Sequence, residues 1–399
     1  MVNFRSWAIP NPLNLHIISL LSHVTKTSDS IYQADNSNSL PLSEEALAQL
    51  VIDIKKWAKE LGFQDIGITD IDLGEHKEHL KNWLIRNFHG ELDYMTHHGD
   101  KRSRPEQLVP GTVRILSARM DYLPGNVESV HILQQPEKAY ISRYSLGRDY
   151  HKIIRKRLAM LGKRIEDKVG AFGYRAFVDS APVLEKALAQ KAGLGWIGKN
   201  TLVLNSRAGS WFFLGELFTD LPLPIDPPQK TSHCGSCFAC AKICPTEAIV
   251  APYQLDTRRC ISYLTIELKG AIPVEFRKAM GNRIFGCDDC QIICPWNKFA
   301  KPTCETDFLP RHKLDSSELA DLFLWTEQEF LDRTAGSPIR RIGYEGWLRN
   351  LAIGLGNAPK TIKVVEALKV RVNPDSERNI ESEMVREHVF WALAQHHSC

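Results

Sequence analysis

The stretch CGSCFACAKICP, residues 234–245, decides how the central part of this chain folds. Its cysteines and proline follow the spacing C-x2-C-x2-C-x3-C-P, which bacterial ferredoxins use to bind 4Fe–4S clusters. Three thiolates on a tight loop can reach three irons of one cubane. The fourth, Cys244, is displaced by a turn and followed by Pro245, so it points away toward another cluster. The spacing therefore predicts a module with two clusters.

A second run, CDDCQIICP (residues 287–295), repeats the last three positions of the first, and Cys260 is the candidate for the missing position. The crossed arrangement of such modules assigns one cluster to Cys234, Cys237, Cys240 and Cys294, and the other to Cys244, Cys260, Cys287 and Cys290. Structural zinc is the alternative because it also uses C-x2-C pairs, but it does not require the C-x3-C-P ending twice. The radical-SAM spacing C-x3-C-x2-C is absent, and we expect no role for Cys304 and Cys399.

Composition limits the class of protein. The chain has 399 residues, a formal net charge of +3, 43% hydrophobic residues and ten cysteines. This length predicts two or three domains. Clustering of the cysteines excludes an evenly stapled secreted scaffold and indicates metal binding in a reducing compartment, the cytoplasm. No run of 18 apolar residues occurs, so we expect no transmembrane helix and no membrane partner.

The N-terminal 42 residues are polar and irregular, and we expect them to be a disordered extension. A targeting peptide is the alternative, because residues 1–28 contain Arg5 and Lys26 but no acid. Pro10, Pro12 and the absence of a small-residue cleavage motif argue against it.

Hydrophobic spacing predicts helices and strands that alternate over residues 43–222, an α/β or α+β pattern. Ser43 can cap a helix that ends at Gly62. The expected strands are 63–69, 114–122, 140–143 and 175–178, and the expected helix between the last two is 151–169. Four prolines within 221–233 indicate a linker to the cysteine-rich segment 223–305. Residues 306–399 are helical, and a weak repeat at an offset of 38 residues favours two-helix HEAT-like repeats.

A glycine-rich loop, GLGWIGKN (residues 193–200), is the nearest approach to a nucleotide motif in the first domain. It fails as a dinucleotide fingerprint because no strand precedes it. We interpret it instead as a backbone-rich loop that lies beside a large planar ligand.

The strings SRYSLGRDYH (142–151), VDSAPVLEKALAQKAGLGWIGKNTLVLN (178–205) and GCDDCQIICPWN (286–297) resemble the epoxyqueuosine reductase family. The resemblance covers about residues 44–395. It implies an oxidoreductase that reduces the epoxide of epoxyqueuosine at tRNA anticodon position 34, the last step of queuosine biosynthesis. It also implies cobalamin, two 4Fe–4S clusters, a tRNA substrate and an external electron donor, and we expect a monomer. The implied fold is α+β: a reductive-dehalogenase-like cobalamin-binding α/β domain, a two-cluster ferredoxin-like module and C-terminal HEAT-like helices.

The resemblance also assigns roles to individual residues. Asp179 corresponds to the family's proton donor. The expected cobalamin contacts are Arg102, Tyr144, Asp179, Gly195, Asn200, Ser210, Ser262 and Asp288.

Two residues near this expected site have competing interpretations. Asp179 could instead cap a helix over 183–191, because D-S-A-P suits a capping residue before a first-turn proline. As an acid in a dry pocket, it would have a raised pKa and stay protonated at neutral pH. Asp149-x-His151 begins the base-off cobalamin motif D-x-H-x-x-G, but Ile154 stands where glycine is required. We therefore interpret His151 as structural or pocket-lining and not as a cobalt ligand.

Charge is concentrated in two windows. Residues 101–175 carry sixteen Lys or Arg against seven Asp or Glu, and residues 333–371 carry eight against two. The second window contains SPIRRIGYEGWLRN (337–350), where arginines for phosphates alternate with aromatic rings for unstacked bases. A solvated helix face with buried aromatic rings is the alternative. With the resemblance, we predict tRNA contacts from Arg340, Arg341, Tyr344, Trp347 and Arg349.

Two other functions fit parts of the pattern. A cobalamin-dependent reductive dehalogenase usually begins with a twin-arginine export signal, which residues 1–42 do not carry. A non-catalytic two-cluster electron carrier would not need about 180 residues before its clusters. Cobalamin retention by the reconstituted protein separates the enzyme from the carrier.

Overall fold

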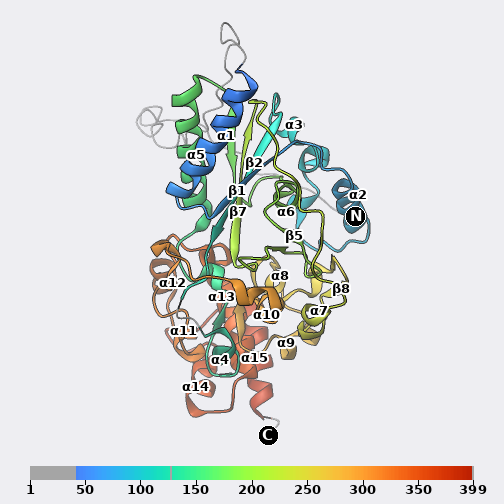
Figure 1. The fold of residues 1–399 in the computed structure, drawn as a ribbon. Coiled ribbons are helices and arrows are strands. Elements are labelled where there is room, and N and C mark those ends of the chain that lie inside the picture. The colour runs from blue at the N-terminus through green and yellow to red at the C-terminus, as the bar shows by residue number, and fades with distance from the viewer. Residues whose placement is uncertain (1–41, 126–127, 398–399) are drawn as a thin grey trace, which may run out of the picture.

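An antiparallel four-stranded sheet forms the centre of the N-terminal part (Figure 1). The computed structural model describes residues 42–125 and 128–397, so the predicted extension lies outside it except for Leu42. The strand order is β1-β2-β7-β4. The strands are β1 (Asp65–Thr69), β2 (Arg114–Asp121), β7 (Phe212–Thr219) and β4 (Tyr174–Phe177).

Helices cover both faces of this sheet. On one face lie α1 (Glu44–Glu60) and α5 (Tyr150–Val169), and on the other lies α6 (Glu185–Lys191) (Figure 1). Successive side chains of a strand alternate between faces. Leu116 and Ala118 therefore pack with α1 and α5, whereas Ile115 packs with α6. Ser43 caps α1 through a 3.2 Å bond from the Ala46 amide, as the sequence predicts.

The remaining elements of the first half are short. They are α2 (His76–Ile85), α3 (Pro105–Leu108), α4 (Ser129–Leu133), β3 (Tyr140–Ile141), β5 (Trp196–Ile197) and β6 (Val203–Leu204).

The cysteine-rich segment is a layer of short elements against the lower end of the sheet. They are α7 (Ala239–Ile243), β8 (Ile249–Ala251), β9 (Gln254–Leu255), α8 (Ile261–Ile266), α9 (Val274–Met280), β10 (Arg283–Phe285) and α10 (Asp289–Ile292). Strand β10 pairs in parallel with β3, from the first half of the chain. The connection between β2 and α5 is thereby fixed to the cysteine-rich layer.

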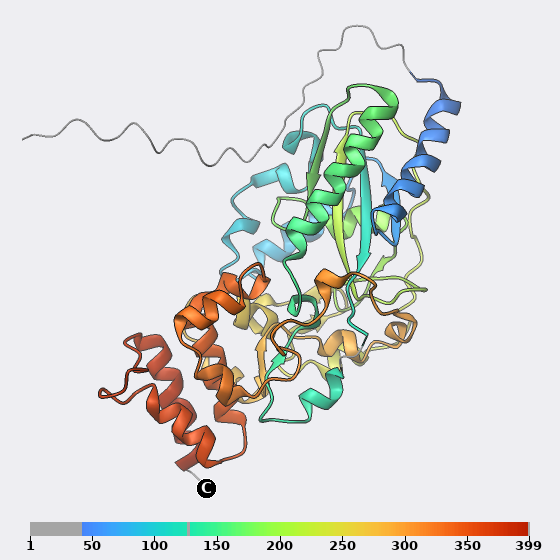
Figure 2. The same ribbon diagram turned by 90° about the vertical axis from the view of Figure 1, so that its left-hand side faces the viewer.

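The C-terminal part is helical, as predicted. Its helices are α11 (Leu319–Phe323), α12 (Glu327–Arg333), α13 (Gly343–Asn357), α14 (Ile362–Val370) and α15 (Glu383–His397). Figure 2 shows them at the end of the molecule opposite α1. The two copies of the weak repeat fall on α13 and α15, which pack together closely: a Cβ on Gly356 would lie 2.5 Å from the Trp391 ring. A HEAT-like classification stays a prediction.

Helices and strands are thus mixed along the chain, which confirms the α+β class. Among the described residues, no helix is both long and apolar enough to cross a membrane.

Candidate functional site

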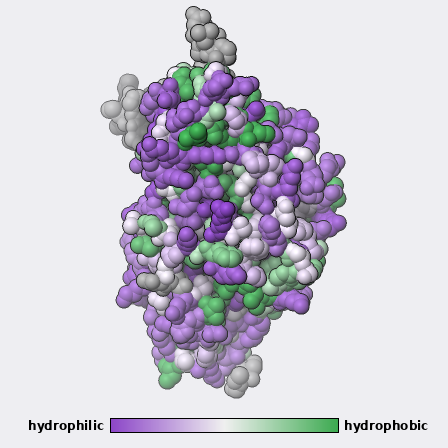
Figure 3. Space-filling model, viewed as in Figure 1, coloured by the Kyte–Doolittle hydropathy of each residue, from purple (hydrophilic) through white to green (hydrophobic). Residues whose placement is uncertain are grey.

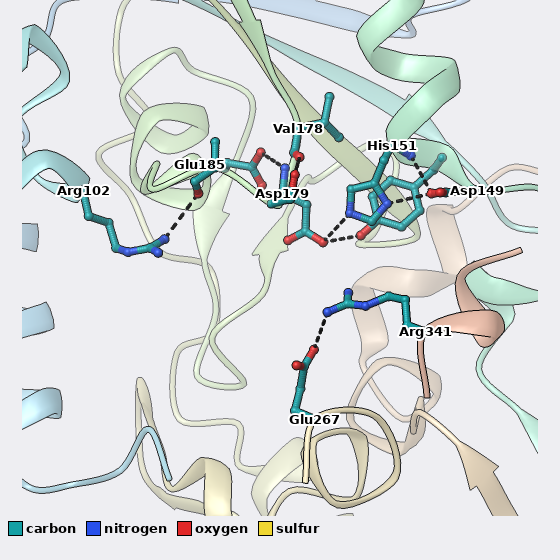
Figure 4. A network of polar contacts seen from close by, with 11 residues as sticks. Arg102, Asp149, His151, Val178, Asp179, Glu185, Glu267 and Arg341 are labelled. Carbon is teal, nitrogen blue, oxygen red and sulfur yellow. Dashed lines mark hydrogen bonds and ion pairs between the residues drawn. The ribbon is translucent and has the colours of Figure 1, made fainter. Parts of the chain in front are cut away.

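A pocket of about 280 Å³ opens where the sheet domain, the cysteine-rich layer and the C-terminal helices meet. Residues from all three parts line it, and Figure 4 shows its polar walls. The side chains that carry its chemistry are Tyr144, Tyr150, His151, Asp179, Cys260, Ser262, Glu267 and Arg341. The pocket therefore exists only in the assembled fold.

Asp179 projects into this pocket from the loop after β4. Its carboxylate accepts a 2.5 Å hydrogen bond from the Tyr150 hydroxyl and lies 3.1 Å from Nε2 of His151. Its own amide donates to Oε1 of Glu185 at 2.5 Å. The backbone has a φ of 52°, which few residues other than glycine adopt without support from their surroundings. These contacts hold the carboxylate in the pocket.

The alternative that Asp179 caps a helix is wrong. Helix α6 begins at Glu185, its capping position is Leu184, and no side chain caps it. The Asp179 side chain instead hydrogen-bonds to the first turn of α5.

His151 is held between two carboxylates. Its Nδ1 lies 2.7 Å from Oδ1 of Asp149, the residue that caps α5, and its Nε2 faces Asp179. Burial alone lowers the pKa of His151, but the two carboxylates outweigh it and raise the pKa to about 9. The ring is therefore protonated at neutral pH. His151 lines the pocket, as the sequence analysis expects.

The pKa predicted for Asp179 is wrong in direction. Burial raises the pKa of this carboxyl, but the hydrogen bonds from His151 and Tyr150 outweigh burial and hold the pKa below its ordinary value. Asp179 is therefore ionised at neutral pH, and the neighbouring proton resides on His151. The predicted direction is wrong because it takes account of burial alone and omits the protonated His151 that contacts the carboxylate.

Two further carboxyls lie beneath Asp179, and the sequence analysis missed both. Glu216, on β7, is fully buried and accepts a 3.2 Å bond from Ser117. Its other oxygen, Oε2, is buried without a hydrogen-bond partner among the described residues. Burial and the charge of Asp179 raise the pKa of Glu185 to about 7, and burial and Glu185 raise that of Glu216. A single acid within the apolar strand FFLGELFT was the available signal for Glu216.

The opposite wall of the pocket carries an ion pair. Nη2 of Arg341 lies 3.2 Å from Oε1 of Glu267, and about half of the Arg341 side chain is exposed (Figure 4). Arg341 is thus a cation at the pocket rim with one carboxylate partner.

The cysteines form two groups. Cys234, Cys237, Cys240 and Cys294 line one pocket of about 310 Å³, together with Trp296 and Phe299. In the described part of the chain, no three Cys, His, Asp or Glu side chains stand close enough to hold a single metal ion. The pocket is larger than one ion needs, since a water molecule occupies about 30 Å³.

The other group lies deeper. Burial raises the pKa of the Cys290 thiol, and Cys260, Asp288, Cys244 and Cys240 raise it further, so these groups are close neighbours. Cys287 is similarly affected by Cys260. Cys260 also lines the pocket of Asp179.

The glycine-rich loop lies against the thiol groups and not in the Asp179 pocket. Nζ of Lys199 donates to the carbonyls of Gly235 (2.6 Å) and Cys237 (2.9 Å), and Asn200 donates to the Cys290 carbonyl at 3.4 Å. A Cβ on Gly195 would lie 2.2 Å from the Leu204 carbonyl oxygen. Asn200 therefore lies against a thiol loop and Gly195 packs against β6, and the cobalamin contacts of both stay predictions.

The other predicted cobalamin contacts are divided. Tyr144 and Ser262 line the Asp179 pocket, and Arg102 reaches the carbonyl of Ala181 at 3.5 Å, two residues beyond Asp179. Ser210 is buried and bonded to Asn297 and Gln291.

Asp288 is also away from this pocket. It is buried and accepts bonds from Tyr140, Ser142 and the Arg143 amide. Asp288 and Ser210 thus both have protein partners, and their contacts to cobalamin stay predictions.

Burial divides the predicted tRNA residues. Arg340 and Arg341 are exposed, and Tyr344 is partly buried with its hydroxyl donating to the Trp325 carbonyl at 2.5 Å. The contacts predicted for Trp347 and Arg349 are wrong, because both side chains are at most 2% exposed. Trp347 stacks on Trp325, and Arg349 donates to the carbonyls of α8 and its following loop.

Comparisons with known proteins agree on one family. Residues 102–180 match the model described as "Epoxyqueuosine reductase QueG, DUF1730", and residues 233–297 match "4Fe-4S double cluster binding domain". The chain is 66% identical over 355 residues to a Pseudomonas aeruginosa protein named epoxyqueuosine reductase, covering 89% of this chain and 97% of that protein.

Two solved structures have the same overall fold. One is an epoxyqueuosine reductase with a tRNA-Tyr epoxyqueuosine-modified stem loop, with a TM-score of 0.79, 28% identity and coverage of 88% of this chain and 90% of that one. The other is the Bacillus subtilis epoxyqueuosine reductase with an aspartate catalytic loop swung out of the active site, with a TM-score of 0.77, 27% identity and coverage of 88% and 91%.

Proposed function

The chain belongs to the epoxyqueuosine reductase family of oxidoreductases, and we propose that it reduces the epoxide of epoxyqueuosine at tRNA anticodon position 34 to queuosine. One observation carries the proposal: a single pocket brings the Asp179–His151 pair together with Cys260 of the deeper thiol group. Epoxide removal as water consumes two electrons and two protons. This pocket suits that requirement because it places a thiol of the proposed electron path near the proton that His151 holds.

We propose that the two thiol groups each hold one 4Fe–4S cluster, with the ligands that the crossed arrangement assigns. The family match over residues 233–297 supports two clusters in this segment. The position of Cys260 at the wall of the Asp179 pocket supports the deeper group as the last donor before the substrate.

Cobalamin is proposed for the same pocket. Tyr144 and Tyr150 supply aromatic walls, and Ser262 supplies a hydroxyl. Nε of Arg102 is a buried donor without a partner among the described atoms, beside the loop of Asp179. This mixture of flat walls and free donors suits a large ring with polar substituents. Bound there, cobalamin would supply reduced cobalt as the electron donor to the substrate ring.

The chain's own residues supply the acid. His151 holds a proton at neutral pH, and its Nε2 faces Asp179 across 3.1 Å. We propose that Asp179 passes this proton to the departing epoxide oxygen, with Tyr150 fixing the carboxylate. The swung-out aspartate loop of the Bacillus subtilis enzyme supports a mobile role for the loop of Asp179.

The tRNA is proposed to bind over the rim of this pocket. Arg341 lines this pocket, Arg340 precedes it in the chain, and both are exposed cations of the kind that phosphates attract. The modified base must leave its stack to enter the pocket. The structure with an epoxyqueuosine stem loop supports this substrate class.

The remaining expectations stay proposals of the same kind. We propose three domains (43–222, 223–305 and 306–399), a dehalogenase-like cobalamin domain, HEAT-like C-terminal helices, a monomer and a cytoplasmic enzyme with an external electron donor.

Reconstituted protein should convert an epoxyqueuosine-modified tRNA stem loop to the queuosine form under reducing conditions, as measured by nucleoside mass spectrometry. Chain without cobalamin should not do so. Turnover without cobalamin, or failure of the fully loaded protein to form queuosine, would contradict the proposal.

A further inference from the structure

The two thiol groups differ in their access to solvent. Cys237 of the first group is exposed, and its pocket of about 310 Å³ opens at the surface beside Lys298 and Phe299. The deeper group instead reaches the Asp179 pocket through Cys260. Electrons bound for the active site therefore have their shortest route from solvent through the first group.

Large apolar side chains of the segments that carry these thiols are exposed. Phe238, Ile243, Ile293 and Phe299 are each 40–44% exposed. Phe238, Ile243 and Ile293 come from the two cysteine runs, and Phe299 follows the second run and lines the opening. Figure 3 shows apolar surface interleaved with polar surface over the region of α7. Exposed apolar groups gathered at one place mark an interaction surface more often than scattered ones.

The charge around the opening has one sign. The three segments that border it, 192–215, 227–246 and 290–302, contain six Lys or Arg and no Asp or Glu. None of the six forms an ion pair with a carboxylate in the described part of the chain. The acids that directly adjoin segments 227–246 and 290–302 in the chain are each paired: Asp226 with Lys55, Glu247 with Arg259 and Asp289 with Arg283. This surface is therefore suited to an acidic partner.

We propose that a donor face, made of Phe238, Lys242, Ile243, Ile293, Lys298 and Phe299, docks a small acidic electron-carrier protein. The inference rests on the proposed function, because it requires a cluster in the first thiol group. Each reduced carrier would lose one electron and the cluster would gain one, with no bond or proton transferred, so two carriers serve one epoxide. We favour a protein partner over RNA at the donor face because this face lies beside the first thiol group. The modified base of the tRNA must instead enter the separate pocket of Asp179.

The test uses holoenzyme and a reduced, acidic plant-type 2Fe–2S ferredoxin, a carrier of low reduction potential. Stopped-flow absorbance follows cluster reduction in wild type and in Lys242→Glu/Lys298→Glu. At about 0.05 M salt, we expect the variant to have a roughly tenfold lower second-order rate constant, with the difference shrinking near about 0.5 M salt. Binding of the ferredoxin, measured by calorimetry, should weaken in parallel. Reduction by dithionite, which needs no docking, should be unchanged.

Lys360→Glu/Lys369→Glu, at and just before α14 at the far end of the molecule, is the matched control because it also reverses the charge of two exposed lysines. If the charge-reversed variant loses iron from the first thiol group, Lys242→Gln/Lys298→Gln is used in its place in the same assay. Equal rates in wild type and variant would overturn the proposal. So would weaker tRNA binding with an unchanged ferredoxin rate, which would assign the face to RNA. If ferredoxin reduces the clusters at the expected rate but no queuosine forms, the proposed function is contradicted and the docking inference stands.

Discussion

The carboxylate of Asp179 and the imidazole of His151 lie 3.1 Å apart, although 28 residues separate them in the chain. This contact decides where the proton resides. It lowers the pKa of Asp179 against the effect of burial and contributes to a His151 pKa of about 9. At neutral pH the pair is carboxylate and imidazolium.

Asp179→Asn should remove the final proton transfer and leave the site intact. Asparagine has the same shape and tolerates the positive φ of this position better than most residues. We expect turnover to fall by about 10²–10⁴-fold. Single-turnover conversion of the tRNA stem loop measures the effect, and unchanged cluster and cobalamin absorbance spectra show that the cofactors remain. Turnover close to wild type would remove Asp179 from the acid role.

The rate should fall as pH rises through about 9, because His151 then loses its proton. His151→Gln should be slow at every pH and lack this falling limb. A pH profile of kcat/KM for the two proteins measures the difference. A falling limb retained in His151→Gln would assign it to another group.

His151 should also couple pH to stability. Its folded pKa lies above the unfolded value of 6.5, so its stabilisation is complete below about pH 6.5 and is lost as pH rises to about 9. The free energy of unfolding of wild type should exceed that of His151→Gln at pH 6 by more than at pH 9.5. Urea titration at both pH values measures this, and an equal difference would contradict the raised pKa.

Cysteine substitutions should divide by group. Cys237→Ser and Cys290→Ser should each lower the iron content by about half, because each removes a ligand of one proposed cluster. Cys304→Ser, at an exposed cysteine outside both groups, should retain full iron and is the control. Iron analysis and electron paramagnetic resonance measure the remaining cluster. Full iron in Cys290→Ser would contradict the ligand assignment.

The exposed arginines should contribute to tRNA affinity in a salt-dependent way. Arg340→Ala/Arg341→Ala removes two cations near phosphates, so binding should weaken more at low salt than at high salt. Filter binding over a salt series measures the slope. A loss that does not depend on salt would point to misfolding.

Trp347 should affect stability and not RNA recognition. Its ring is fully buried and stacks on Trp325 with centroids 5.7 Å apart. Trp347→Ala should lower the free energy of unfolding by about 3–5 kcal/mol through the cavity that it leaves. Urea denaturation measures this change. A stable variant with weaker tRNA binding would restore the RNA role that burial argues against.

Much of the local architecture could be predicted because it is encoded locally. Ser43 caps α1, and β2 and α5 lie within a residue or so of their expected ranges. The pattern over 337–350 was ambiguous, because alternating arginine and aromatic residues suits both an RNA surface and a buried helix. Arg349 is buried and Arg341 is exposed, and this difference arises only from the packing of the helical segment against α8 and α12.

The sequence by itself determined the two thiol runs and the mixed α+β class. These follow from spacing and periodicity, which act over a few residues. Only the tertiary structure decided the ionisation of Asp179, the burial of Glu216 and the placing of Cys260 at the active pocket. Those properties depend on desolvation and on hydrogen bonds between segments far apart in the chain, and a pKa responds to neighbours in space rather than in sequence.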